Sequence, residues 1–136
     1  MVRGKSKTLT IYRSENSNVF GGYTDLSWDG SNNYRSDSNA FMFSLENKNN
    51  TSLLLRPSSS YYRDQAIYDG LDTLSSFGSS DLRVCSNADK LLCSSSNLGQ
   101  SYSFNQNIYG SNSAQTFLAG SYNFYLNEIE VYQKIF

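Results

Sequence analysis

The chain has 136 residues, 11 basic and 12 acidic side chains, a formal net charge of −1 and no histidine. This length suits one domain with its own core, so we expect residues 1–136 to form a single domain. The near-zero charge argues against a nucleic-acid partner, because such binding needs a basic stripe. No run of about 18 apolar residues occurs, so we expect no membrane span.

Several short segments carry apolar residues at every second position, which is typical of half-buried β-strands. Residues 8–12 alternate through Leu9 and Ile11. Residues 40–45 alternate as well, and the pattern predicts that Phe41, Phe43 and Leu45 lie on the core face. The short apolar run at residues 52–55 is consistent with a fully buried strand, and residues 81–84 suggest another short one.

The C-terminal pattern changes parity. Phe124 and Leu126 fall on even positions, whereas Ile129 and Val131 fall on odd ones. This change predicts a bulge or tight turn at Asn127 that separates two strands. The best helical candidate, residues 88–93, is barely a turn and a half long. Many short strands joined by Ser-, Asn- and Gly-rich turns predict an all-β fold, a two-sheet antiparallel β-sandwich with long polar loops.

The chain lacks the usual side chains of catalysis. Without histidine, the Ser-His-Asp and Cys-His mechanisms are excluded, and the commonest metal ligand is missing. Two cysteines cannot complete a structural zinc site, and no phosphate-binding glycine loop is present. Glu128 and Glu130 share one face of a strand at a spacing near that of glycosidase carboxylates. We favour a simpler interpretation, in which both face water. We therefore expect no enzyme activity, no metal and no cofactor.

Cys85 and Cys93 leave two alternatives open. They form a disulfide that closes a short loop, or both are reduced and partly buried. The first ten residues have no apolar signal region, which favours an intracellular protein, whereas a disulfide would indicate an extracellular one.

The order of the segments resembles the TLDc domain family over roughly residues 7–133. The resemblance is carried by TLTI at 8–11, VFGGYT at 19–24, Trp28, NAFMFSL at 39–45, AIY at 66–68, FG at 77–78, DL at 81–82, SNLGQSY at 96–102, FLAG at 117–120 and the stretch from Phe124 to EIEVY at 128–132. The helical segment that usually precedes the first of these strands is absent, and the usual glycine-rich FGgg stretch reads FGSS at 77–80. The resemblance implies a β-sandwich without a catalytic residue set. It also implies protection from oxidative damage and binding to the vacuolar proton-pumping ATPase.

These observations predict a non-enzymatic module that binds a protein partner, with its oligomeric state left open. We expect Tyr23, Trp28 and Tyr34 to form an exposed aromatic cluster, since such residues anchor interfaces. Asp29 and Asn33, in the adjoining polar turn, complete the predicted binding site. A secreted, lectin-like module that binds carbohydrate through aromatic platforms and polar loops is the alternative.

Overall fold

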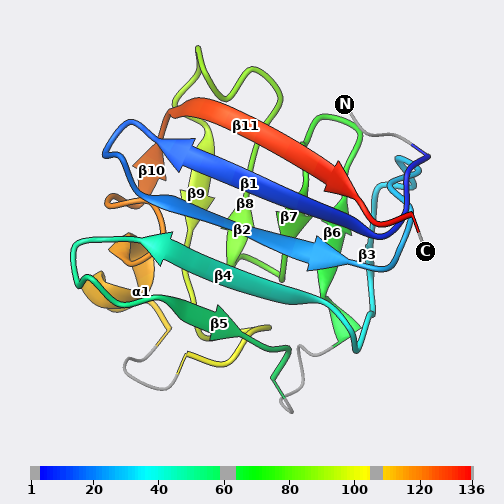
Figure 1. Cartoon of the computed structure of the whole chain (residues 1–136), viewed down its shortest axis with the longest axis horizontal. Coiled ribbons are helices and arrows are strands. Elements are labelled where there is room, and N and C mark those ends of the chain that lie inside the picture. Colours follow the sequence, from blue (N-terminus) through cyan, green and yellow to red (C-terminus); the bar gives the residue numbers. More distant parts are fainter. Residues whose placement is uncertain (1–3, 59–63, 105–108, 136) are drawn as a thin grey trace.

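Two antiparallel β-sheets packed face to face form the protein, which confirms the predicted all-β sandwich (Figure 1). The computed structural model describes residues 4–58, 64–104 and 109–135. The strand order is β11-β1-β2-β4-β5 in the five-stranded sheet and β10-β9-β8-β7-β6-β3 in the six-stranded sheet. The elements are β1 (Thr8–Ser14), β2 (Val19–Thr24), β3 (Asn33–Arg35), β4 (Phe41–Glu46), β5 (Leu53–Leu55), β6 (Ile67–Asp69), β7 (Ser76–Phe77), β8 (Leu82–Arg83), β9 (Ser94–Ser96), α1 (Asn112–Thr116), β10 (Asn123–Phe124) and β11 (Leu126–Gln133).

Aromatic side chains fill the space between the sheets. The largest fully buried side chains are Trp28, Tyr12, Tyr102, Phe20, Phe77 and Phe124. The inner face of β1 contributes polar side chains that are hydrogen-bonded within this layer. Thr10 Oγ1 donates to Ser75 Oγ at 3.0 Å, and the Tyr12 hydroxyl donates to the Ser75 carbonyl at 2.7 Å. Because these buried hydroxyls have partners, the core tolerates them.

The prediction that Phe41, Phe43 and Leu45 face the core is wrong. On β4, Met42 and Ser44 are fully buried between the sheets, whereas Phe41 and Phe43 point to the outer face and Leu45 is exposed. The inner layer has little room over these strands, because the Phe77 ring lies against Gly22 on β2. A Cβ on Gly22 would lie 2.7 Å from that ring.

Two other expectations also need correction. β5 is an edge strand rather than a fully buried one, since Leu55 is 2% exposed but Leu54 is 48% exposed. Residues 88–93 form turns and no helix. Among the described residues the only α-helix is α1, which begins after the cap Ser111, whose side chain accepts a hydrogen bond from Ala114 N. No described helix is long and apolar enough to span a membrane.

The predicted bulge at Asn127 is confirmed, but it lies within β11 and does not separate two strands. Arg13 of β1 pairs with Glu128, and Ser14 pairs with Leu126, so Asn127 is the extra residue on β11. β10 ends just before this point and belongs to the other sheet. The chain therefore passes from the six-stranded sheet to the five-stranded sheet at Tyr125, and β11 forms an edge strand of the second.

Candidate interaction surface

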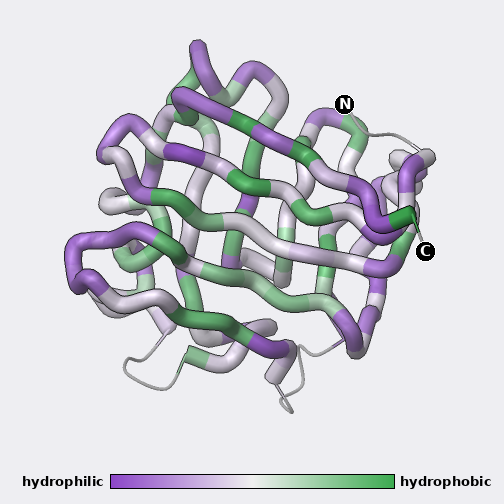
Figure 2. Tube along the Cα trace, viewed as in Figure 1, coloured by the Kyte–Doolittle hydropathy of each residue, from purple (hydrophilic) through white to green (hydrophobic). Residues whose placement is uncertain are grey.

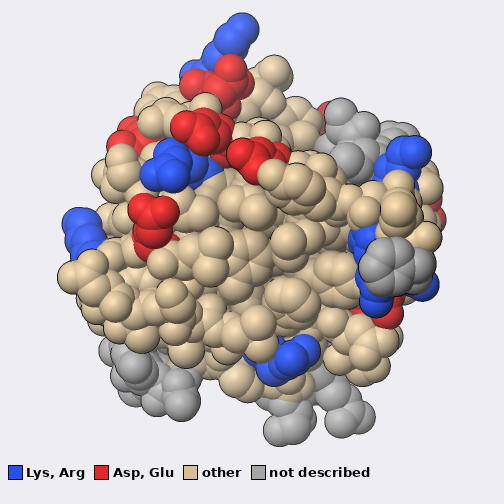
Figure 3. Space-filling model, viewed as in Figure 1, with Lys and Arg blue, Asp and Glu red and all other residues tan. Residues whose placement is uncertain are grey.

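The outer face of the five-stranded sheet carries apolar side chains in cross-strand rows. The register aligns Leu9, Tyr23 and Phe41 in one row, and Ile11, Gly21, Phe43 and Leu54 in the next. The hydropathy trace shows apolar segments along β1, β4 and β5 (Figure 2). The space-filling view of the same face shows uncharged side chains across its middle, with charged ones toward its rim (Figure 3). We call the side chains of these two rows, together with Tyr132, the outer face.

Gly21 lets this face pack closely. A Cβ there would lie 2.9 Å from Phe43 Cζ and 1.8 Å from the Thr10 carbonyl oxygen. The Phe43 ring therefore lies over the glycine and is only 7% exposed although it points away from the core. The centre of the outer face is therefore closely packed, while Leu54 at its edge is exposed.

A shallow depression of about 610 Å³ lies at one end of the outer face. Tyr23 and Phe41 stack at its floor, with ring centroids 5.4 Å apart and planes inclined by 19°. Arg56 lies over the Phe41 ring at 5.5 Å. Polar groups border the aromatic pair, among them Lys7, Asp25, Asn39, Gln133 and Lys134. The depression thus combines an aromatic platform with hydrogen-bonding groups of both charges.

Tyr23 and Asp25 form a hydrogen-bonded pair in this depression. The Tyr23 hydroxyl donates to the Asp25 carboxylate, and this hydrogen bond raises the pKa of Tyr23 to about 12. The same bond, a second one from Asn39 Nδ2 at 2.9 Å and the nearby lysines lower the pKa of Asp25. Near neutral pH the phenol is protonated and the carboxylate is ionised, so neither group is suited to exchanging a proton with a substrate.

Trp28 does not belong to an exposed cluster, and that prediction is wrong. Its side chain is 1% exposed, its indole Nε1 donates to Thr8 Oγ1 at 2.9 Å, and its ring meets Phe77 edge-on at 5.9 Å. A large ring with a satisfied N–H fits the core well. Tyr23 lies on the outer face of one sheet, whereas Tyr34 lies on β3 at the edge of the other. The three aromatics are thus separated.

Tyr34, Asp29 and Asn33 are held by neighbours in the six-stranded sheet. The Tyr34 ring packs on Tyr68 at 4.9 Å, and its hydroxyl donates to the Ser79 carbonyl. The Asp29 and Gly30 backbone N–H groups donate to the buried Asp69 carboxylate at 2.8 and 2.9 Å. Asn33 pairs with Asp69 as the first residue of β3. These contacts organise a turn. Within the described ranges, no group of three or more His, Cys, Asp or Glu side chains could hold a metal ion.

Glu128 and Glu130 are exposed on the edge strand β11, as favoured from the sequence. Glu128 lies 3.8 Å from Arg13, and Glu130 accepts a hydrogen bond from the Tyr132 hydroxyl. Ile129 and Val131 take the inner side of the strand, yet both remain partly exposed. The two carboxylates therefore lie on an open surface rather than in an enclosed pocket.

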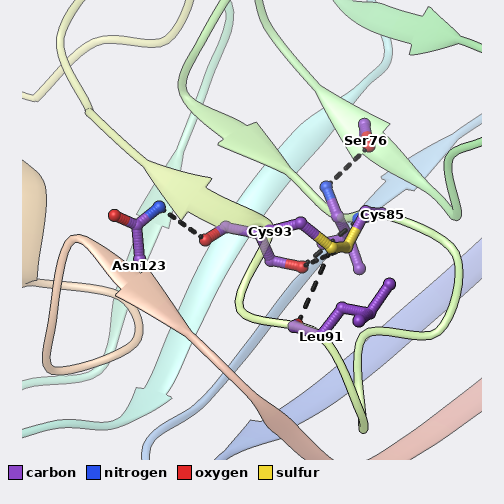
Figure 4. The surroundings of a disulfide bond; sticks show 7 residues. Ser76, Cys85, Leu91, Cys93 and Asn123 are labelled. Atoms are coloured by element: carbon purple, nitrogen blue, oxygen red, sulfur yellow. Dashed lines mark hydrogen bonds between the residues drawn. A yellow bond between two sulfur atoms is a disulfide. The ribbon is translucent and has the colours of Figure 1, made fainter.

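Cys85 and Cys93 form a disulfide, which resolves the alternatives that the sequence left open (Figure 4). The loop that it closes is tied to both sheets. Cys85 N donates to Ser94 Oγ at 3.2 Å, and Leu126 N at the start of β11 donates to the Ala88 carbonyl at 3.0 Å. The bond thus stabilises a connection beside the edge strand.

The sequence reasoning missed the outer face because it assigned the larger apolar side chains to the core. The signal was the glycine pair Gly21-Gly22 beside the uninterrupted apolar triplet at residues 41–43. A central strand with apolar residues on both sides, next to a strand without side chains at two positions, indicates packing on both faces.

Comparison with curated proteins finds no match. The model of the TLDc domain matches residues 1–134, nearly the whole chain, in agreement with the segment order and the two-sheet sandwich. The chain therefore belongs to the TLDc domain family.

Proposed function

We propose that this chain is a non-enzymatic protein-interaction module whose partner packs against the outer face. The observation that carries the proposal is the pair of apolar rows on β1, β2, β4 and β5, which no described segment covers and which end in the exposed Leu54. Contiguous exposed apolar surface rimmed by polar groups is characteristic of protein interfaces.

The arrangement of this face suits an interface. Aromatic side chains supply large contact area at its centre, and charged residues at the rim can exclude water and orient a partner. The depression at one end of this face holds a tyrosine and an aspartate that are hydrogen-bonded to each other. Together with the absence of histidine, this supports a binding role over a catalytic one.

Membership of the TLDc family suggests the process. The resemblance implies protection from oxidative damage and binding to the vacuolar proton-pumping ATPase, so we propose that ATPase as the first partner to test. The partner surface should be predominantly apolar where it meets Phe43 and Leu54.

Site-specific photo-crosslinking tests the proposal. A photoreactive residue at position 54 should cross-link to the added ATPase, whereas one at Leu71, an exposed leucine on the loop after β6, should not. Equal cross-linking at both positions, or cross-linking at 71 alone, would show that the outer face is not the binding surface. Leu71 matches Leu54 in residue type and exposure, so it controls for non-specific contact.

Carbohydrate binding is the second candidate, supported by the stacked Tyr23 and Phe41 rings and by the hydrogen-bonding groups of Asn39 and Asp25 around them. The disulfide also favours it, since disulfides persist in oxidising compartments. A glycan array probed with the wild-type chain and with Tyr23→Ala tests it. Glycan signals that disappear in the variant would support this function, and an array without signals would eliminate it.

A further inference from the structure

β11 is the long free edge of this sandwich. Among the described strands the other sheet edges are β5 and β3, with three residues each, and β10, with two, whereas β11 has eight. Short edge strands and prolines are common protections against pairing with another chain. β11 has neither, so it presents the longest row of unpaired backbone groups in the described structure.

The free backbone groups belong to odd-numbered residues. Lys134 N donates to the Lys7 carbonyl of the chain entering β1 at 2.8 Å. Because successive residues of a strand direct their N–H and C=O groups to opposite sides, Ile129, Val131 and Gln133 direct theirs to the open edge. No described residue outside β11 makes a backbone hydrogen bond to these three.

The side chains of β11 determine which kind of strand would be complementary to it. On the inner side, Ile129 and Val131 pair with Tyr12 and Thr10 of β1, yet they remain 44% and 37% exposed. On the outer side, Glu128 and Glu130 are followed by Tyr132 and, one residue past the strand, Lys134. A fitting strand therefore needs apolar residues on one side and a basic residue opposite a glutamate on the other.

A second copy of β11 meets both requirements. We propose that two copies of the chain associate through their β11 strands, antiparallel, with a two-fold axis at Val131, to form one continuous ten-stranded sheet. Val131 then lies opposite Val131 of the second copy, and Ile129 lies opposite Gln133. On the outer side Glu128 meets Lys134, and Glu130 meets Tyr132. The three outward-directed residues of each copy make about six backbone hydrogen bonds.

Charge and the length of β11 together favour this register. Moving the pairing by one step, so that Val131 lies opposite Ile129 of the second copy, brings Glu130 against Glu130. Moving it by two steps brings Glu128 against Glu130. Like charges directly opposite destabilise a strand pair. A shift in the other direction brings Glu130 opposite Lys134, so charge does not exclude it, but it places Ile129 opposite Ile135, beyond the end of β11 at Gln133, and separates Glu128 from Lys134.

A charge-swap experiment tests the pairing in solution. Sedimentation velocity from about 1 to 200 µM should show a concentration-dependent dimer of the wild-type chain. Glu128→Lys and Lys134→Glu should each raise the dimer dissociation constant by roughly tenfold or more, because each places like charges opposite each other at two symmetric positions. The double variant should restore dimerisation, and Lys48→Glu, with the same charge change elsewhere, should leave it unchanged. A wild-type chain that stays monomeric, or a double variant weaker than both single variants, would overturn the proposal.

A backbone variant tests the edge itself. Val131→Pro removes an N–H that faces the open edge and leaves the hydrogen bonds to β1 intact, and proline is tolerated at such positions. This variant should be a folded monomer by circular dichroism and sedimentation, whereas Val131→Thr, which keeps the N–H, should still dimerise. A folded Val131→Pro dimer would place the contact elsewhere. Should Val131→Pro not fold, the charge-swap variants still test the proposed pairing.

Leu54→Lys, on the opposite edge of the sheet, should dimerise like the wild type. This control separates the β11 contact from partner binding at the outer face.

Discussion

Leu54 and Leu55 provide a direct test of which side of the five-stranded sheet is buried. The two leucines are neighbours on β5, but Leu54 joins Phe43 on the outer face while Leu55 belongs to the core cluster. Replacing a fully buried leucine by alanine removes its transfer free energy and leaves a cavity, so Leu55→Ala should lower the free energy of unfolding by about 3 kcal/mol. The half-exposed Leu54 buries much less apolar surface, so Leu54→Ala should lower the free energy of unfolding by about 1 kcal/mol or less.

Urea denaturation followed by circular dichroism measures the difference. With a denaturant slope of about 1.5 kcal/mol/M, the midpoint should fall by about 2 M for Leu55→Ala and by about 0.7 M or less for Leu54→Ala. Equal shifts for the two variants would refute the assignment of faces, because they would mean that both leucines are buried, as the sequence pattern alone suggested.

Three further results are expected. Trp28, the only tryptophan, should show blue-shifted fluorescence that iodide does not quench until the protein unfolds, and quenching of the native protein would contradict its burial. Burial raises the pKa of Asp81 to about 6, so the folded state holds this proton more tightly than the unfolded chain. The resulting stabilisation, about 3 kcal/mol, should be complete below about pH 4 and lost as the pH rises through about 6. Asp81→Asn should flatten this pH dependence of the free energy of unfolding, and an unchanged slope would assign it to another group. Reducing the Cys85–Cys93 disulfide should cost about 2.5 kcal/mol by loop entropy, while a Cys85→Ser/Cys93→Ser variant should be insensitive to reductant.

The fold class could be predicted from the sequence because alternation and turn residues are local signals. The parity change at Asn127 also predicted a bulge, which lies within β11, whereas the chain passes from β10 to β11 at Tyr125. The direction in which each strand faces could not be predicted in the same way. Alternation indicates that the two sides of a strand differ in polarity. Which side faces the core depends on the opposite sheet, where Phe77 occupies the space over Gly22.

The predicted exposed aromatic cluster was wrong for a related reason. Trp28 follows a polar turn and precedes another one, which suggests exposure, but Thr8 from β1 supplies the acceptor that lets its indole N–H be buried. Such a pairing joins residues that lie 20 positions apart, and no local pattern indicates it. Tyr23 lies on the outer face, whereas the sequence pattern predicts that its stacking partner, Phe41, faces the core.

The affinity of the partner for three forms of the chain tests the central claim most directly. Titration calorimetry of the purified ATPase, or of whichever partner cross-links at position 54, should be run with the wild type, Leu54→Lys and Leu71→Lys. Loss of an interface anchor typically costs 2 kcal/mol or more, so Leu54→Lys should weaken binding by about 30-fold or more while Leu71→Lys binds like the wild type. Unchanged affinity of Leu54→Lys would contradict the account.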